Sequence, residues 1–158
     1  MLRPLILALM LTAAPALAQN TTFGAMKADT SAPVEVAADN LAVNQSDGSA
    51  VFTGNVVIGQ GEMRLAADSV TVIYAEGGQN KIQSLKAEGN VTLTAGNDAA
   101  QADAASYDVA GGTIALDGEV VLKQGQNVLT GDHMTVNLAD GAAKVDGRVR
   151  SVLQPGGN

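Results

Sequence analysis

Apolar and polar residues alternate along most of this chain with a period of two, which is the pattern of a β-strand with one buried face. In the clearest window, residues 85–94, the odd-numbered positions are Leu, Ala, Gly, Val and Leu, and the even-numbered positions are Lys, Glu, Asn, Thr and Thr. Turn-forming Gly, Asn and Asp residues separate such windows, and no stretch after residue 33 has a helical period. The pattern predicts an all-β fold of short antiparallel strands over residues 34–153.

A two-part cassette recurs four times within these windows. The aspartate that opens and the glycine that closes each copy are Asp39 and Gly54, Asp68 and Gly89, Asp103 and Gly118, and Asp132 and Gly147. Each glycine precedes the next aspartate by 14 residues, whereas aspartate precedes glycine by 15 residues in three copies and by 21 in the second. This period predicts stacked copies of one unit, with two or three strands each, that bury their apolar faces against one another. The longer copy predicts a longer turn at residues 76–80.

The alternation keeps the same parity in all copies, which predicts a shared apolar inner face and a polar outer face. The cassette glycines have the inner parity, where a missing side chain permits a bend or a close approach. The pattern leaves two interpretations open, a solid core that holds a structural β-solenoid together or an apolar slot that accepts hydrocarbon. The candidate lining residues are Phe52, Val56, Ile58, Val70, Val72, Leu85, Val91, Leu93, Ile114, Leu116, Val120, Leu122, Met134, Val136 and Val149.

The N-terminus predicts export. Residues 1–18 combine the basic Arg3, an apolar stretch over residues 5–17 and an Ala-Leu-Ala ending, which is typical of a cleaved secretory signal peptide. The apolar stretch is shorter than the roughly 20 residues that span a bilayer. We therefore expect a signal peptide at 1–18, a flexible segment at 19–33, the folded domain at 34–153 and a flexible tail at 154–158.

Composition argues against several classes of function. The chain has no cysteine, one histidine and a formal net charge of −7, and this acidity disfavours nucleic acid as a partner. The single histidine, His133, is expected on the outer face of a strand, away from any nucleophile. No metal-ligand spacing or phosphate-binding motif is present in the sequence. We therefore expect a protein that is not an enzyme, with no catalytic residue, metal or cofactor.

The recurrent Asp39, Asp68, Asp103 and Asp132 have two interpretations. Stacking would align them in a row, as in calcium-binding β-rolls, but the Gly-Gly-x-Gly-x-Asp nonapeptide of those proteins is absent. The favoured interpretation is that each carboxylate accepts backbone N–H groups where the chain enters a strand.

Several segments together resemble a known family. They read Pro-Val-Glu-Val-Ala-Ala-Asp-Asn-Leu at 33–41, Ala-Val-Phe-Thr-Gly-Asn-Val-Val-Ile-Gly-Gln-Gly at 50–61, Ala-Glu-Gly-Asn-Val-Thr-Leu at 87–93 and Leu-Asp-Gly-Glu-Val-Val-Leu-Lys-Gln-Gly at 116–125. Their order is similar to the OstA-like domain of the LptA family, over about residues 34–153.

The resemblance implies a twisted, open, V-shaped β-jelly roll. It also implies a periplasmic bridge protein that shelters the lipid A acyl chains of lipopolysaccharide and passes them from an inner-membrane complex to an outer-membrane translocon. The implied partners are lipopolysaccharide, LptC-like and LptD-like OstA domains at the two membranes, and further copies of the chain stacked head to tail.

Both ends of the stack present strand edges that could pair with another chain. One edge is formed by Val34, Glu35 and Val36, and the other carries the cations Lys144, Arg148 and Arg150 on its outer face. The cations have two interpretations that the sequence leaves open, protection of the edge against aggregation or docking to an acidic end of a neighbour by β-augmentation.

Overall fold

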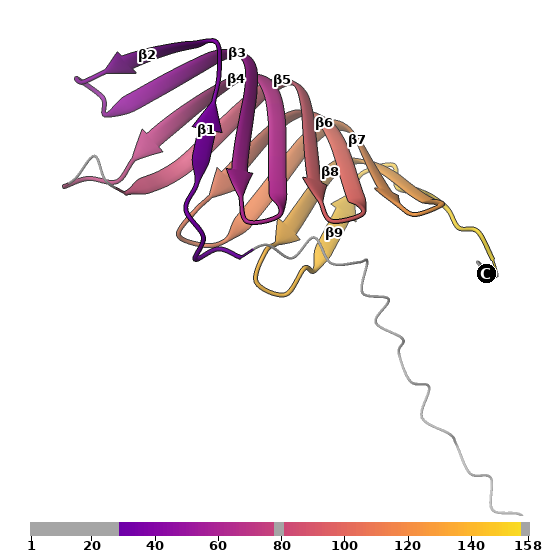
Figure 1. The fold of residues 1–158 in the computed structure, drawn as a ribbon. Helices are drawn as coiled ribbons and strands as arrows, with labels where there is room; N and C mark the ends of the chain where they lie inside the picture. Colours follow the sequence, from indigo (N-terminus) through magenta and orange to yellow (C-terminus); the bar gives the residue numbers. More distant parts are fainter. Residues whose placement is uncertain (1–28, 78–80, 156–158) are drawn as a thin grey trace, which may run out of the picture.

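Antiparallel β-strands make up the chain in the computed structural model, which describes residues 29–77 and 81–155 (Figure 1). The predicted signal peptide at 1–18 lies outside these residues, and so does part of the longer turn predicted at 76–80. Among the described residues no helix has the length and apolar character needed to cross a bilayer. The strands within the described ranges are β1 (Glu35–Ala37), β2 (Asn40–Asn44), β3 (Ser49–Gln60), β4 (Met63–Tyr74), β5 (Ile82–Ala95), β6 (Asp98–Asp108), β7 (Thr113–Gln124), β8 (Asn127–Asn137), β9 (Ala143–Asp146) and β10 (Arg150–Val152).

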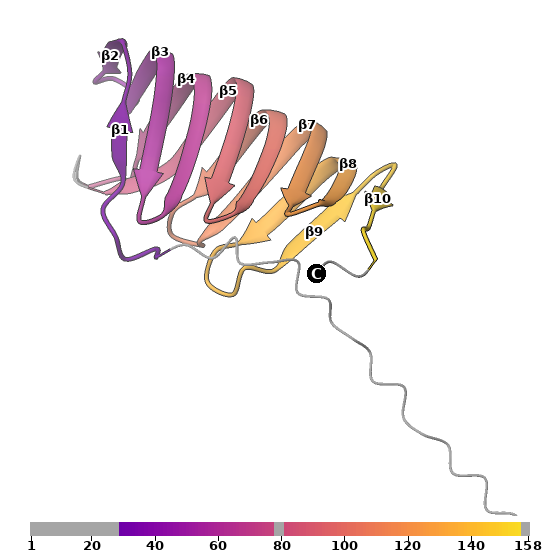
Figure 2. The same ribbon diagram turned by 45° about the vertical axis from the view of Figure 1, so that its right-hand side comes forward.

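The strands form one sheet in the order β1-β3-β4-β5-β6-β7-β8-β10 (Figure 2). At one edge β2 also pairs with β3, and at the other edge β9 also pairs with β8. All of these pairs are antiparallel, and most link neighbours in sequence. The predicted all-β class and antiparallel stack are confirmed.

The central strands are longer than the sequence predicts. Strands β3 to β8 each contain 11 to 14 residues, so the predicted short length is wrong, while two strands per repeat lie within the predicted two to three. Two predicted short strands join into one long strand, because the chain bends between them without losing its pairing to the neighbours. One repeat is therefore a hairpin of two long, bent strands.

The bends lie at the same level in every hairpin and fold the sheet in two. The register shifts between Thr53 and Val56 in the β3–β4 pair, and the following pairs shift at the corresponding places. We call this line of bends the corner. The first arm contains β2, β9 and the strand parts 49–53, 69–74, 82–88, 104–108, 113–117 and 133–137, and the second arm contains β1, β10 and the parts 56–60, 63–67, 91–95, 98–102, 120–124 and 127–131.

Each corner is built by the cassette pair of glycine and aspartate. Gly89 has a φ of 83° and Asn90 a φ of 48°, and such left-handed residues produce a bulge that bends the strand. A Cβ atom on Gly89 would lie 2.5 Å from Oδ2 of Asp68 on the neighbouring strand. The other three copies have the same arrangement. The prediction that the glycines line the inner face is therefore wrong, because the space beside each glycine is filled by its aspartate at the exposed corner.

Candidate functional site

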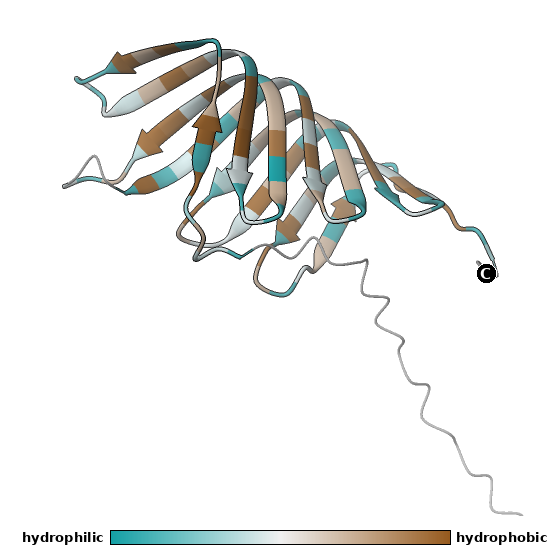
Figure 3. Cartoon of the chain, viewed as in Figure 1, coloured by the Kyte–Doolittle hydropathy of each residue, from teal (hydrophilic) through white to brown (hydrophobic). Residues whose placement is uncertain are grey.

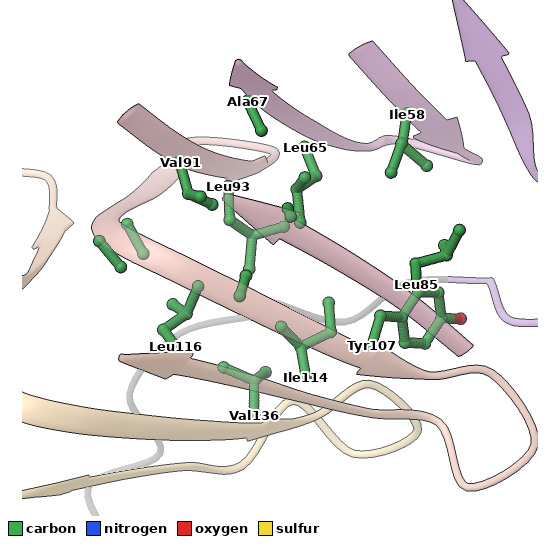
Figure 4. Packing of buried hydrophobic residues seen from close by; sticks show 14 of the residues in the cluster. Ile58, Leu65, Ala67, Leu85, Val91, Leu93, Tyr107, Ile114, Leu116 and Val136 are labelled. Carbon is green, nitrogen blue, oxygen red and sulfur yellow. The ribbon is translucent and has the colours of Figure 1, made fainter. Parts of the chain in front are cut away.

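The predicted lining residues gather in one hydrophobic cluster between the two arms. Apolar and polar residues alternate along the strands that carry them (Figure 3). Figure 4 shows Leu93 of the second arm pointing toward Ile114 and Leu116 of the first. Most of the candidates belong to one hydrophobic cluster, and each of these is at most 2% exposed. They are Val56, Ile58, Val70, Val72, Leu85, Val91, Leu93, Ile114, Leu116, Val120, Leu122, Met134 and Val136.

The two remaining candidates, Phe52 and Val149, lie near the ends of the sheet. Phe52 is half-buried against the cluster, and Val149 is 52% exposed. Val149 comes two residues after its cassette glycine, at the position that Val91 has in the second copy. It leads into β10, the terminal strand of the described sheet, where no further repeat covers it. Its exposure therefore results from its place in the stack rather than from its parity.

The inner face is also exposed at the other end. Leu41 and Val43 of β2 pair with Phe52 and Ala50 of β3, and cross-strand partners point to the same face. Their side chains are 56% and 60% exposed. They are absent from the predicted lining set, although they follow Asp39 with the parity by which Val70 and Val72 follow Asp68. The apolar interior is thus closed along its length and uncovered at its ends.

Between the ends, the interior is packed. A void of about 10 Å³ lies among Ile58, Met63, Leu65, Leu85, Ala87, Ala105 and Tyr107. A space of this size holds at most one water molecule, so the structure is a closed form in which the arms fill the space between them. Alanines line much of this face, including Ala67, Ala100 and Ala102, and their small size leaves the opposing side chains few atoms to interlock with.

Gln60 is the buried polar side chain of this interior, 2% exposed. Its Oε1 accepts a hydrogen bond of 2.6 Å from the hydroxyl of Tyr107, and its Nε2 donates to the carbonyl oxygens of Thr30 and Ala32. Burial raises the pKa of the Tyr107 hydroxyl, the bond to Gln60 opposes this, and the nearby Asp108 adds to it. The hydroxyl therefore stays protonated and donates. Gln60 is absent from the predicted site residues, because its only signal in the sequence is a polar residue at an inner position.

The recurrent aspartates form a row along the corner. Asp39 accepts a hydrogen bond of 3.0 Å from the side chain of Asn55, and Asp68 accepts one of 2.8 Å from Asn90. In these two copies the partner is the side chain of the left-handed residue after the glycine, not the backbone N–H groups that the sequence predicted. Within the described residues, no group of three or more His, Cys, Asp or Glu residues could hold a metal ion.

The fourth aspartate is held by a cation. Nη2 of Arg148 lies 2.6 Å from Oδ1 of Asp132, and its Nε also donates to this carboxylate. The hydrogen bond from Arg148 lowers the pKa of Asp132; burial opposes this, and the charges of Arg148 and His133 lower the pKa further. In the third copy Glu119 occupies the position of this arginine.

The predicted partner edges are exposed strand edges. β1, with Glu35 and Val36, pairs with only one half of β3, and β10 pairs with one half of β8. Lys144 lies 3.5 Å from Asp146, and Arg148 is bound to Asp132 as described. Arg150 is exposed on β10. The cations therefore lie at the β9–β10 edge, as the sequence places them.

His133 lies on the outer face, where the sequence places it. Its Nδ1 is 2.6 Å from Oδ1 of Asp117 on the neighbouring strand, and both side chains are more than half exposed. The pair is a solvated cross-strand contact.

Comparisons with known proteins find a matching family model, a relative of similar sequence and a solved structure of similar fold. The model of the family described as "LptA/(LptD N-terminal domain) LPS transport protein" matches residues 35–142. An uncharacterised protein of Rhizobium meliloti strain 1021 is 32% identical over 114 residues, which cover 67% of this chain and 61% of that protein, so the chain spans about three fifths of this relative. The crystal structure of LptH, described as the LptA-homologous periplasmic component of the lipopolysaccharide transport device of Pseudomonas aeruginosa, matches with a TM-score of 0.72. The match has 20% identity and covers 81% of this chain and 99% of LptH, which establishes a shared fold.

Proposed function

Since this chain belongs to the family of LptA and the LptD N-terminal domain, described as lipopolysaccharide transport proteins, we propose that it is a periplasmic carrier of lipopolysaccharide. Its inner face shelters lipid A acyl chains and passes them along a bridge of similar domains. The proposal is supported above all by the apolar interior, which runs through the stack and is uncovered at both ends.

Hydrocarbon shelter is the physical requirement of such a carrier. Burying a methylene group is worth about 0.8 kcal/mol, so an acyl chain of about a dozen carbons needs on the order of 10 kcal/mol of protection from water. The buried Val, Leu, Ile and Met side chains of both arms supply a surface of that chemistry. Because the interior is packed, an acyl chain enters only when the arms separate.

The ends of the stack suit head-to-tail assembly with like domains. At the N-terminal edge Leu41 and Val43 extend the inner face to the solvent, and at the C-terminal edge Val149 does the same. The strands at these edges offer backbone groups for β-augmentation. Stacked copies, or LptC-like and LptD-like domains at the two membranes, would join their interiors into one continuous apolar path. A lipid then moves between equivalent surfaces with little change in free energy.

Site-specific crosslinking tests the carrier function. A photo-crosslinking phenylalanine analogue at position 52, at the exposed end of the inner face, should capture lipopolysaccharide when the protein is made in a Gram-negative host. The matched control is the same analogue at position 53, because Thr53 is the next residue and lies on the exposed outer face. Equal labelling at positions 52 and 53 would defeat the proposal.

The packed interior also favours a second candidate, an exported structural β-solenoid that assembles through its ends without a ligand. Native mass spectrometry of protein purified from its host separates the two. A mass increment equal to one lipopolysaccharide molecule supports the carrier, and bare oligomers support the structural role.

A further inference from the structure

Two polar residues of the interior contact each other, and one of them departs from the repeat. Six residues after the cassette glycines stand Gln60, Ala95, Gln124 and Leu153; Gln60 is buried, whereas Gln124 is half-buried. Four residues after the cassette aspartates stand Val43, Val72 and Val136, but Tyr107 in the third copy. Tyr107 donates the 2.6 Å hydrogen bond to Gln60.

This hydrogen bond joins the two arms. Gln60 ends β3 on the second arm, and Tyr107 lies near the end of β6 on the first arm, so both stand away from the corner, at the mouth where the arms open. The small void of the interior is lined by Tyr107 itself and by Ile58, two residues before Gln60. The bond thus closes the mouth directly above the apolar interior.

The chain segment 29–34 lies across the same mouth, and we call it the strap. It begins with a turn in which the amide of Ala32 donates to the carbonyl of Asp29, and the carboxylate of Asp29 accepts from the amide and hydroxyl of Ser31. It then leads through Pro33 into β1 at the edge of the sheet (Figure 1). The strap is therefore a locally ordered turn rather than an extended strand.

Contacts on both sides fix the strap in the mouth. A Cβ atom on Gly61, in the β3–β4 turn of the second arm, would lie 3.6 Å from Cβ of Asp29 and 4.0 Å from Cβ of Ala32. A Cβ atom on Gly112, in the β6–β7 turn of the first arm, would lie 3.8 Å from Cγ2 of Thr30. The two hydrogen bonds from Gln60 to the strap carbonyls complete the attachment.

We propose that the strap is a latch on the interior: Gln60 holds its carbonyls at residues 30 and 32 over the mouth, with Thr30 beside Gly112 of the first arm. The strap must leave this place, and the bond from Tyr107 to Gln60 must break, before the mouth opens and admits a hydrocarbon chain. This inference rests on the proposed carrier function, since it assigns the control of the same interior. Gln60 and Tyr107 act as positioning residues that couple the strap to both arms. Release of the strap frees the carbonyls of Thr30 and Ala32 to solvent, so the open form costs few unsatisfied polar groups.

A disulfide can lock the strap. The chain contains no cysteine, and the Cβ separation of 3.6 Å between positions 29 and 61 falls in the range of disulfides. In the double variant Asp29→Cys/Gly61→Cys, we expect oxidation to reduce the capture of purified lipopolysaccharide at least tenfold and reduction by dithiothreitol to restore it. The reduced form of the same variant is the control for any effect of the substitutions themselves.

The outcomes separate the two proposals. Equal capture by oxidised and reduced protein, with wild-type capture intact, overturns the latch and leaves the carrier function standing. No capture by wild-type protein overturns the carrier function and, with it, the latch.

Single substitutions provide a second measurement that does not depend on the disulfide. Tyr107→Phe removes only the hydroxyl, and Gln60→Leu removes both sets of bonds; each should speed lipopolysaccharide uptake severalfold and raise hydrogen exchange at the Ala32 amide. Tyr74→Phe and Gln124→Leu are the matched controls, because Tyr74 is the second tyrosine of the first arm and Gln124 bonds to Asp98 within the second arm. Uptake unchanged by both latch variants would contradict the latch.

Discussion

At the scale of single residues, the most consequential feature is the pairing of aspartate and glycine at each corner. The glycine adopts a backbone conformation that other residues rarely adopt, and the aspartate of the neighbouring strand fills the space that a side chain would need. In three of the four copies the carboxylate also binds the Asn or Arg side chain that follows the glycine, whereas the third copy has Glu119 there. The recurrence of both residue types in the sequence thus records one bend, repeated four times.

Gly89→Ala tests this account of the corner. The new Cβ would meet Asp68 at 2.5 Å and would sit on a residue with a φ of 83°, so we expect a loss of about 1–3 kcal/mol in the free energy of unfolding. Urea denaturation measures it. Asp68→Gly in the same chain removes the clash and should recover part of the loss, and the absence of any recovery would show that the carboxylate is not what excludes a side chain.

Tyr107 should make stability depend on pH in the alkaline range. Burial raises its pKa above the ordinary value of about 10, so the folded protein holds this proton more tightly than the unfolded chain. Its contribution is complete below pH 10 and is lost as the pH rises from there through the folded-state pKa. Tyr107→Phe should flatten this part of a denaturation series between pH 9 and 11, while Tyr74→Phe should not.

At the scale of elements, the two edges of the sheet differ in charge. β1 carries Glu35 and is followed by Asp39, whereas the β9–β10 edge carries Lys144, Arg148 and Arg150 in a chain of net charge −7. Lys144 and Arg148 already contact acidic residues of their own edge. Arg150 is therefore the cation of this edge that is most available to pair with an acidic residue of a neighbouring molecule. This asymmetry favours head-to-tail over head-to-head contact.

Charge reversal at the second edge tests that orientation. Lys144→Glu/Arg150→Glu should weaken self-association at least tenfold in sedimentation velocity at low salt, and added salt should weaken wild-type association in the same direction. Lys86→Glu/Lys123→Glu changes the net charge equally on exposed positions of central strands. If both double variants associate alike, the edge cations do not dock the neighbour.

At the scale of the whole molecule, one apolar cluster holds the two arms together and is also the surface offered to the lipid. Stability and binding therefore draw on the same residues. The strand pairing within each arm and the row of aspartates along the corner hold the strands in register. The arms can therefore separate without the loss of strand pairing. The latch and the cluster together favour the closed form, and a bound acyl chain would replace the contacts between the arms.

Truncation of the cluster should show this dual role. Ile114→Ala removes a fully buried side chain from the first arm and should cost about 2–5 kcal/mol of unfolding free energy. Val57→Ala, on the exposed side of β3, should stay within about 0.5 kcal/mol. Thermal and urea denaturation measure both. Equal effects would mean that the interior is not the main source of stability.

Much of this architecture is readable from period and spacing. The parity of residues such as Leu93, Ile114 and Val136 identifies the inner face because a strand's side chains alternate between its two faces and only one face is buried. The bend inside each long strand was not predicted, since the alternation continues through each bulge and Gly89 lies inside an unbroken alternating window. Gln60 was not predicted either. Its hydrogen-bond partner, Tyr107, is 47 residues away, and nothing local in the sequence connects the two.

The sequence by itself determined the strand class, the four-fold repeat, the inner and outer faces and the family. These properties depend on the alternation of neighbouring residues and on constant spacing, and both are visible in the linear sequence. Only the tertiary structure decided that the cassettes are corners rather than strand ends, that the interior is closed between uncovered ends, and that the strap, Gln60 and Tyr107 meet across the mouth. Those features depend on how two folded arms face each other, and contacts between residues far apart in the chain leave no period to read.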